Sequence, residues 1–517
     1  MADASEQRFR LPIAGERPRD AGAQYEIQLS HLCNNRCVFC VSGRNTHHKI
    51  APIVPLDEVL GPLRSAREKG YQKVTVLGGE PTILPYFLDV VREAVALGFS
   101  EIVLFSNGAR LHRPELLDAV LATGGNFEFR FSFQGATRES HERTTKRKGS
   151  WDQLLASVDA ARARGQRVTA NMCVVATNYE DVPRFAELLV PRGVSQLHLD
   201  MMNPYDAGIS DVAELHAVQA RYSLMAPRLA AMIAAFPPGF DVHVGNLPFC
   251  VAPALAASVH HAGQPTETAT VNGAQLDTKD KYDDKTSQRR KAPGCATCVF
   301  DHACTGFFGA YLEQHGDAER RPVDAAALAE VDPERRLFSL HVRAEVRRAL
   351  DAIGAKARLR DTREHDLDVE LDGGVALQIG RPRAPGAHAA TDRVSLTLRA
   401  GGARGVEQMS ALFDALVAGG HAPVHAPGAD AVVGLRPSVA RRLGRLRAAA
   451  PFAGASWSRT RPVTDGVEVL LASGDGGRAA LWLTEERGLP RGGYRVDGDA
   501  TPGLVDGLRA ALRAIGR

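Results

Sequence analysis

Two hydrophobic periodicities alternate along residues 25–236. Short apolar runs, typical of buried strands, are each followed by a stretch whose apolar residues recur three and four positions apart, as on one face of a helix. Six strands that alternate with helices predict a parallel sheet with right-handed crossovers. The predicted strands lie at 26–30, 73–77, 101–105, 127–133, 167–175 and 196–202, and the predicted helices at 84–97, 113–122, 151–163, 180–190 and 211–235.

The pattern changes after Pro237-Pro238-Gly239, which marks a boundary. The mixed charge run at 279–285 is typical of a solvated loop. From residue 324 on, the pattern predicts a helix at 332–353, a hairpin at 367–371 and 375–379, a strand at 394–398 and a helix at 406–417. A similar order at 467–472, 479–483, 494–496 and 502–515 indicates a degenerate repeat, with a helix at 437–449 between its copies.

These changes of pattern predict four parts. They are a polar N-terminal tail at 1–24, a core at 25–236, a cysteine-bearing region at 237–323 and an α+β domain of unassigned role at 324–517.

The net charge and the apolar content of the chain limit the kinds of molecule that it is expected to bind. The chain of 517 residues has a net charge of +3 with scattered basic residues, so we expect no nucleic-acid or membrane partner. No apolar run is long enough to cross a bilayer, and residues 1–24 lack the apolar segment of a signal peptide. Seven of the eight cysteines fall into two spaced sets, a usage that fits a reducing cytoplasm.

The first cysteine set, Cys33, Cys37 and Cys40, follows the first predicted strand at CxxxCxxC spacing. Three thiolates can ligate three irons of a [4Fe–4S] cube and leave the fourth iron open, as a catalytic metal requires. A zinc loop or a disulfide is the alternative, but zinc loops favour paired CxxC units and four nearby ligands. With the aromatic Phe39 before its last cysteine, this stretch resembles the cluster loop of radical S-adenosylmethionine (SAM) enzymes.

This resemblance implies a partial (β/α)6 barrel, a truncated relative of the TIM barrel, with its chemistry at the carboxyl ends of the strands. It further implies that the open iron binds SAM and that one electron from the cluster splits SAM into methionine and a 5′-deoxyadenosyl radical. That radical abstracts hydrogen from a substrate.

A Gly-Gly-Glu-Pro segment, Gly78 to Pro81, follows the second predicted strand and looks like the family segment that binds the amino group of SAM. Paired glycines let the backbone approach a ligand closely, and the Glu80 carboxylate can accept hydrogen bonds from an ammonium group. An ordinary tight turn is the alternative.

Polar residues at three further strands are candidate SAM contacts by the same resemblance, with ordinary strand ends or caps as the alternative for each. They are Asn107, Ser132, Gln134 and Asn171. Cys173 shares the strand face of Asn171, where it is either a core thiol or a hydrogen-atom donor to a substrate radical. His198 and Asp200 are candidates for substrate contact or proton transfer, and a structural role is equally open.

A second set of four cysteines, Cys250, Cys295, Cys298 and Cys304, is sufficient for a closed site that holds zinc or a second [4Fe–4S] cluster. Its CxxCx5C spacing resembles part of the auxiliary-cluster pattern of SPASM and twitch regions, which favours iron–sulfur. The cysteine that the SPASM pattern places four residues after Cys304 is Phe308 here, so we expect one auxiliary cluster.

Together these features predict a radical SAM enzyme, oxidoreductase-like, with SAM and two iron–sulfur clusters as cofactors. By family analogy we expect its substrate to be a peptide or protein under post-translational modification and its reductant to be a flavodoxin or ferredoxin. A small-molecule oxidoreductase of a biosynthetic pathway is the alternative enzyme, and a metal-bearing binding protein is the non-enzyme alternative.

Overall fold

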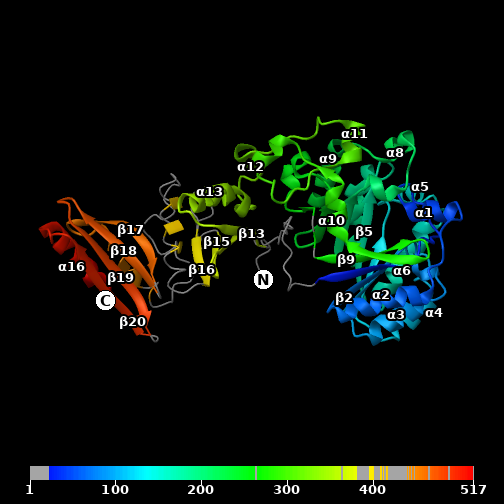
Figure 1. Cartoon of the computed structure of the whole chain (residues 1–517), viewed down its shortest axis with the longest axis horizontal. Helices are drawn as coiled ribbons and strands as arrows, with labels where there is room; N and C mark the ends of the chain where they lie inside the picture. The colour runs from blue at the N-terminus through cyan, green and yellow to red at the C-terminus, as the bar shows by residue number, and fades with distance from the viewer. Residues whose placement is uncertain are drawn as a thin grey trace. The chain divides into compact units, whose positions relative to one another are not determined.

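The computed structural model describes residues 23–515 except 262, 264, 363–364, 381–394, 401–407, 410, 413–414, 417–438, 440–441, 444, 447–448, 464–465 and 487–488. The chain divides into two compact units, Met1–Asp324 and Ala325–Arg517 (Figure 1). The N-terminal unit is built on one large sheet with helices, and the C-terminal unit contains two four-stranded antiparallel sheets.

One ten-stranded sheet organises the N-terminal unit, in the order β10-β9-β1-β2-β3-β4-β5-β6-β7-β8. Its first eight strands in the sequence are β1 (Gln24–Gln28), β2 (Lys73–Leu77), β3 (Glu101–Ser106), β4 (Phe127–Ser132), β5 (Arg167–Val174), β6 (Gln196–Met201), β7 (Asp241–Gly245) and β8 (Val259–His260). Neighbours among these eight all run parallel. The predicted α/β class with a radical SAM-type partial barrel is confirmed.

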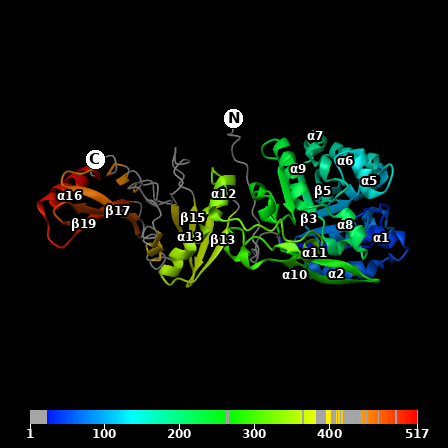
Figure 2. The same cartoon turned by 90° about the horizontal axis from the view of Figure 1, so that it is seen from above.

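Helices cover the sheet through apolar stripes. In α3 (Phe87–Ala96), the buried residues Phe87, Val90, Val91 and Ala94 recur three and four positions apart. The other main helices beside the central strands are α2 (Leu56–Glu68), α4 (Pro114–Leu121), α5 (Arg138–Thr145), α6 (Ser150–Ala163) and α7 (Phe185–Leu189). Figure 2 shows α5 and α6 next to each other, and α6 packs on β4 and β5.

The single helix predicted at 211–235 is wrong. The chain forms two helices, α8 (Val212–Val218) and α9 (Tyr222–Ala235), because the backbone between them makes other hydrogen bonds. The Val218 carbonyl accepts from the Ala176 N–H at 2.8 Å, and the Gln219 carbonyl accepts from two side chains of a later helix.

The sheet also continues past the predicted boundary at residue 237. β9 (Thr266–Asn272) lies parallel to β1, and β10 (Gln275–Asp280) pairs antiparallel with β9. The charge run at 279–285 is therefore not a solvated loop: it forms the end of β10 and the start of α10 (Lys281–Ser287). Lys281 Nζ donates to both oxygens of the buried Glu26 on β1, at 2.8 and 2.9 Å.

The C-terminal unit contains two separate hydrophobic cores. The first lies between α13 (Phe338–Ala352) and the sheet β13 (Ala357–Asp361), β14 (Leu367–Leu371), β15 (Val375–Gly380), β16 (Ser395–Ala400). The second lies between α16 (Pro502–Ile515) and the sheet β17 (Ala455–Val463), β18 (Gly466–Ser473), β19 (Arg478–Glu486), β20 (Leu489–Asp497). Both sheets follow sequence order, and the pattern had missed the first strand of each.

The helix predicted at 332–353 begins later, at Phe338, after the separate helix α12 (Ala325–Val331). The Asp332 carboxylate accepts from the backbone N–H groups of Arg336 and Leu337, at 2.9 and 2.8 Å, and fixes a turn between the two helices. The helices predicted at 406–417 and 437–449 lie largely outside the described residues.

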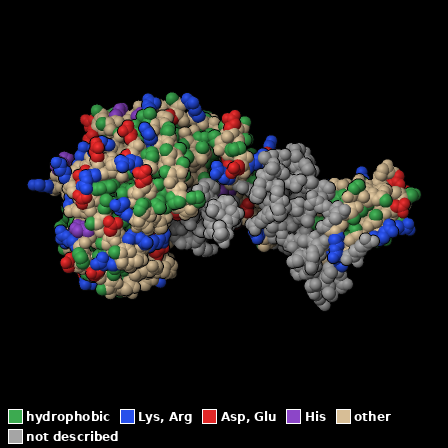
Figure 3. Space-filling model, turned by 180° about the vertical axis from the view of Figure 1, so that it is seen from behind, with side chains coloured by type: hydrophobic (Ala, Val, Ile, Leu, Met, Phe, Trp, Pro, Cys, Tyr) green, Lys and Arg blue, Asp and Glu red, His purple; other side chains and the backbone are tan. Residues whose placement is uncertain are grey.

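Charged side chains of both signs are mixed over the visible face of the N-terminal unit (Figure 3). Within the part of the chain that the structure describes, no helix combines the length and apolarity needed to cross a bilayer.

Leu481 on β19 offers a test of the second C-terminal core. Its side chain is fully buried, so Leu481→Ala is expected to lower the free energy of unfolding by about 2–5 kcal/mol through lost burial and a cavity. Urea unfolding of the fragment 325–517, followed by circular dichroism, measures this change. The exposed Arg478→Ala on the same strand is the control and should shift stability by only about 0.5 kcal/mol. Equal midpoints for the two variants would contradict this core.

Candidate active site and second cysteine centre

The first cysteine set lies in the loop between β1 and α1 (Val41–His47), and Cys40 precedes the helix as its N-cap residue. The loop is fixed from both sides. The Cys33 N–H donates to the Thr46 hydroxyl of α1 at 3.0 Å, and the Val38 N–H donates to the Thr144 carbonyl of α5 at 3.0 Å. Phe39 packs against the small apolar cluster of Val175, Met202 and Val218.

The three thiols lie close enough to affect one another. Burial raises the pKa of Cys37 well above its ordinary value, and Cys40 and Cys33 add to that rise. Burial raises the pKa of Cys33 to about 12, with contributions from Glu80 and Cys40. Clustered, buried thiols are costly as free thiolates, and a cationic metal centre would offset that cost when the thiols lose their protons.

Gly78 and Gly79 pack directly on the chain that leads into this loop. The Gly79 N–H donates to the Ser30 carbonyl at 2.7 Å, and the Glu80 N–H donates to the Leu32 carbonyl at 2.8 Å. A Cβ atom at Gly79 would lie 2.0 Å from the Leu32 carbonyl oxygen, so no side chain fits there. The segment therefore holds the entrance to the cysteine loop through its backbone.

The carboxylate of Glu80 is buried and joins the ends of β2 and β3. It accepts from the Ser106 hydroxyl at 2.8 Å, from the Asn107 N–H at 2.6 Å and from both the N–H and the hydroxyl of Thr82. Burial raises the pKa of Glu80, and these hydrogen bonds oppose the rise. Pro81 begins the short helix η1 (Pro81–Ile83) directly after it.

Asn107 connects the third strand to the cysteine loop. Its Nδ2 donates to Asn34 Oδ1 at 2.7 Å and lies 3.7 Å from Cys33 Sγ, and the Asn35 N–H donates to the same sulfur at 3.4 Å. Both donors are placed to stabilise a thiolate at Cys33.

The other predicted SAM contacts lie on one face of the sheet. Ser132 and Asn171 are register partners across β4 and β5, and Gln134 Oε1 accepts from the Cys173 N–H at 3.3 Å. The same register row continues into His198 on β6 and His243 on β7, which the sequence had not connected. Register partners in a parallel sheet point to the same side.

A second row lies one step nearer the carboxyl ends of the strands. It contains Cys173, Asp200, Gly245 and His260. Burial and then Asp200 raise the pKa of Cys173, with a further contribution from Cys40, so this face of the sheet lies on the side of the first cysteine set. A Cβ atom at Gly245 would lie 2.1 Å from Asp200 Oδ1, so glycine leaves room for this carboxylate.

Three of the residues in these two rows are histidines, whose rings can exchange protons. His198 Nε2 donates to Asp200 Oδ2 at 3.1 Å, which leaves Nδ1 of the ring to accept a proton. The ring centroids of His198 and His260 are 4.9 Å apart, and those of His198 and His243 are 6.2 Å apart. Burial lowers the pKa of His198 and of His260, so both rings are neutral near pH 7.

Lys285, on α10, faces the same groups. It affects the pKa values of Asp200 and His260, and burial lowers its own pKa. Among the described residues its ammonium group makes no hydrogen bond or ion pair. Together with His198 and Asp200, it forms a polar region that can bind a substrate group and move a proton.

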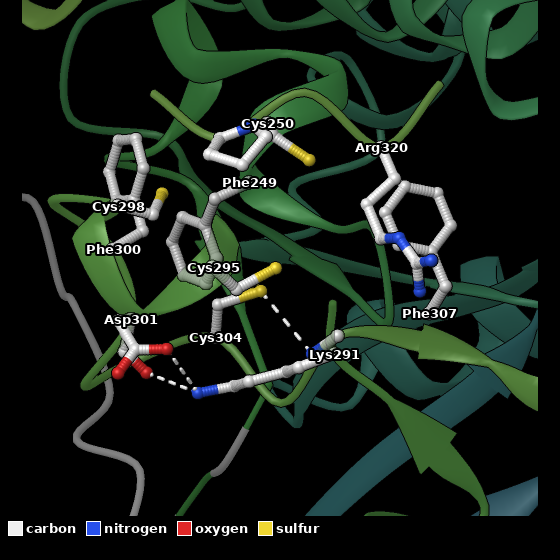
Figure 4. A pocket seen from close by; sticks show the side chains of 12 residues that line it. Phe249, Cys250, Lys291, Cys295, Cys298, Phe300, Asp301, Cys304, Phe307 and Arg320 are labelled. Atoms are coloured by element: carbon white, nitrogen blue, oxygen red, sulfur yellow. Dashed lines mark hydrogen bonds and ion pairs between the residues drawn. The ribbon is translucent and has the colours of Figure 1, made fainter. Parts of the chain in front are cut away.

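The second cysteine set converges on a pocket. Cys250, Cys295, Cys298 and Cys304 line it with Phe249 and Phe300, and its space, counted with its open mouth, is about 360 Å³ (Figure 4). Burial raises the pKa of Cys250 to about 11, and the other three thiols each contribute. The structure thus brings together all four cysteines, although Cys250 and Cys295 are far apart in the sequence.

Backbone N–H groups point at three of these sulfurs. Ala292 N donates to Cys295 Sγ at 3.4 Å, Val323 N to Cys298 Sγ at 3.3 Å and Gly306 N to Cys304 Sγ at 3.3 Å. Hydrogen bonds to ligand sulfurs are a regular feature of iron–sulfur sites, and four thiols around open space fit a cube. Among the described residues, no group of three or more His, Cys, Asp or Glu is placed to hold a single metal ion.

The first site lies in a part of the chain that matches a known protein family. Residues 27–189 match the model of the Radical SAM superfamily. The chain carries a radical SAM domain. That range includes the first cysteine set, the segment 78–81 and the strand ends of β3, β4 and β5.

Curated relatives match about a third of this chain. The chain is 28% identical over 184 residues to a "Probable GTP 3′,8-cyclase" of Saccharolobus islandicus (strain M.14.25 / Kamchatka #1), across 35% of this chain and 58% of that protein. It is 29% identical over 185 residues to "Molybdenum cofactor biosynthesis protein 1" of Drosophila melanogaster, across 34% of this chain and 31% of that protein. The chain thus spans a little over half the length of the first relative and less than a third of the second.

Among solved structures, the chain shows similarity to SuiB of Streptococcus suis bound to S-adenosylmethionine. It is 15% identical, has a TM-score of 0.41 and covers 57% of this chain and 75% of that chain.

Sequence reasoning missed three residues of the site: His243, His260 and Lys285. The two histidines carried no motif and are aligned only by the parallel pairing of β6, β7 and β8. His243 and His260 each lie in a short run of strand-forming residues, which could have indicated two further strands. Both runs lie after the predicted boundary at 237–239, outside the six strands that the pattern predicted.

Gly79→Ala tests the close packing of the 78–81 segment. The added Cβ collides with the Leu32 carbonyl, so we expect displacement of the cysteine loop and at least a tenfold loss of SAM affinity, a free-energy change of about 1.4 kcal/mol. Anaerobic calorimetry with reconstituted protein measures it. Gly61→Ala in α2 is the matched control, because no atom lies within 4 Å of its added Cβ. Wild-type affinity in Gly79→Ala would show that this packing does not support the SAM site.

Proposed function

We propose that the protein is a radical SAM enzyme that generates a 5′-deoxyadenosyl radical and uses it on a substrate held at the carboxyl ends of β4–β8. The convergence of Cys33, Cys37 and Cys40 beside the 78–81 segment carries this proposal. The match of residues 27–189 to the radical SAM model supports it.

Cys33, Cys37 and Cys40 would hold the catalytic [4Fe–4S] cluster. When bound, that cluster supplies the electron that splits SAM. Asn107 and the Asn35 N–H stabilise the Cys33 sulfur, and the backbone of 78–80 keeps the loop in place. Ser132 and Asn171, register partners on β4 and β5, are placed to contact SAM.

Cys250, Cys295, Cys298 and Cys304 would hold a second [4Fe–4S] cluster. The open pocket and the three N–H donors to sulfur support iron–sulfur over zinc. With four cysteine ligands such a cluster is closed to direct substrate coordination, so its role is electron transfer or support of the substrate region.

We propose a peptide or protein as the substrate and a flavodoxin- or ferredoxin-type protein as the reductant, in a reducing cytoplasm. Seven of the eight cysteines fall into the two spaced sets, a usage that supports a reducing compartment. Ala325–Arg517 contains no cysteine, so this large unit is available for substrate docking rather than for a further cluster.

A small-molecule substrate is the second candidate, since relatives of the radical SAM domain carry the name GTP 3′,8-cyclase. Truncation before Ala325 separates the two candidates. An enzyme that docks a peptide through its C-terminal unit loses turnover of the long substrate, whereas a small-molecule enzyme keeps its activity.

The formation of 5′-deoxyadenosine tests the radical chemistry. Reconstituted wild-type protein is expected to release it from SAM with dithionite, and the Cys33→Ala/Cys37→Ala/Cys40→Ala variant is expected to release none, because no cluster remains to deliver the electron. Anaerobic chromatography measures the product. Wild-type protein that carries both clusters yet cleaves no SAM, with or without candidate peptides, would contradict the proposal.

Iron analysis tests the second cluster. Two [4Fe–4S] clusters predict about eight irons per reconstituted chain, and Cys295→Ala/Cys298→Ala is expected to reduce that number to about four. Cys173→Ala is the matched control, since this cysteine belongs to neither set, and it should keep the wild-type iron content. One zinc and four irons per wild-type chain would show that the second cysteine set holds zinc and not a cluster.

A further inference from the structure

A buried cation lies between the polar rows of the sheet and the second cysteine centre. Arg289 begins β11 (Arg289–Arg290). This strand pairs with β12 (Phe307–Phe308), which begins three residues after Cys304. The residue is only 8% exposed, and its guanidinium carbon lies 4.1 Å from the centroid of the Phe308 ring. The ring of Phe308 thus contacts the Arg289 guanidinium, and Phe308 occupies the sequence position at which the SPASM pattern has a cysteine.

The hydrogen-bond partners of Arg289 are all neutral. Its guanidinium donates to Asn246 Oδ1, to the Gly306 carbonyl at 3.2 Å and to His261 Nδ1 at 3.3 Å. His261 is neutral because its Nε2 donates to the Leu247 carbonyl at 2.7 Å while Nδ1 accepts. Among the described residues no carboxylate forms an ion pair with Arg289, so its charge acts on the surroundings without a contact counter-ion.

A continuous chain of hydrogen bonds passes through this guanidinium. Asn246 Nδ2 donates to Asp200 Oδ1 at 3.0 Å, and Asn246 Oδ1 accepts from Arg289. Arg289 donates to the Gly306 carbonyl, and the Gly306 N–H donates to Cys304 Sγ at 3.3 Å. The polar region that faces the radical SAM site is therefore connected to a ligand sulfur of the second centre.

We propose that Arg289 raises the reduction potential of the cluster held by the second cysteine set and couples that potential to the charge of Asp200. The inference rests on the proposed second cluster. Reduction adds one negative charge to a cluster, and a fixed cation in a low-dielectric environment stabilises the reduced form. Arg289 acts through Gly306 and Cys304 and is a positioning residue.

Lys291 provides the contrast within the same pocket. Its ammonium group donates to the carbonyl and to Oδ1 of Asp301, at 2.6 and 2.8 Å, so its charge is balanced by a contact carboxylate (Figure 4). Lys291 lines the pocket of the second cysteine set, and Arg289 is connected to Cys304 through Gly306. Of these two cations, only Arg289 has no contact carboxylate among the described residues.

Potentiometric titration followed by electron paramagnetic resonance tests the inference. The full-length Cys33→Ala/Cys37→Ala/Cys40→Ala protein isolates the second cluster, and Arg289→Gln is made in that background. At a fixed potential, its ratio of reduced to oxidised cluster is expected to fall at least tenfold, which is 59 mV for a one-electron couple. Arg289→Lys keeps the charge and should retain most of the parent potential.

Two further variants separate charge from structure. Lys291→Met/Asp301→Asn removes a neutral ion pair and should shift the ratio less than threefold, whereas Asp200→Asn removes a negative charge and should shift it in the direction opposite to Arg289→Gln. An unchanged potential in Arg289→Gln, or shifts of the same sign in Arg289→Gln and Asp200→Asn, would overturn the role of Arg289. If the parent protein binds no cluster at the second cysteine set, the proposal of a second cluster is itself refuted. If Arg289→Gln does not assemble the cluster, the potential of Arg289→Lys decides: a value far from that of the parent refutes a charge effect.

Discussion

Two backbone hydrogen bonds, at a glycine that has no room for a side chain, hold the start of the first cysteine loop in place. The Gly79 and Glu80 N–H groups donate to the carbonyls of Ser30 and Leu32, and Gly79 has no room for a Cβ atom. From this turn, the Glu80 carboxylate reaches Asn107 at the end of β3, whose amide returns to Cys33. A continuous set of hydrogen bonds therefore links the cysteine loop with the ends of β1, β2 and β3.

The parts of the fold that local sequence encodes were predictable. Strands such as Lys73–Leu77 and helices such as Phe87–Ala96 bury regular apolar patterns, and the pattern alone located them. The hairpin Thr266–Asn272 and Gln275–Asp280 was missed because it is polar and forms the sheet edge, where only one side needs apolar residues. Its pairing with β1 is a long-range contact that no local pattern records.

The same distinction applies to the site. Cysteine spacing and the Gly-Gly-Glu-Pro segment are local, so Cys33 and Glu80 could be named from the sequence. His243 and His260 became neighbours of His198 only through the register of three parallel strands. Lys281 lies in a mixed charge run that is usually solvated, and its partner Glu26 is on the first strand of the chain. Burial of such charges is a tertiary property.

The surroundings of the two cysteine sets differ in charge, and this difference fits a division of labour between the proposed clusters. The Glu80 carboxyl group is connected to Cys33 through Asn107, whereas the Arg289 guanidinium is connected to Cys304 through Gly306. A cation near a cluster raises its reduction potential. In the proposed function, the first site would hold the centre that delivers an electron to SAM. The second favours a centre that accepts electrons, and the hydrogen-bonded chain through Asn246 leads to it from the polar region where the substrate would react.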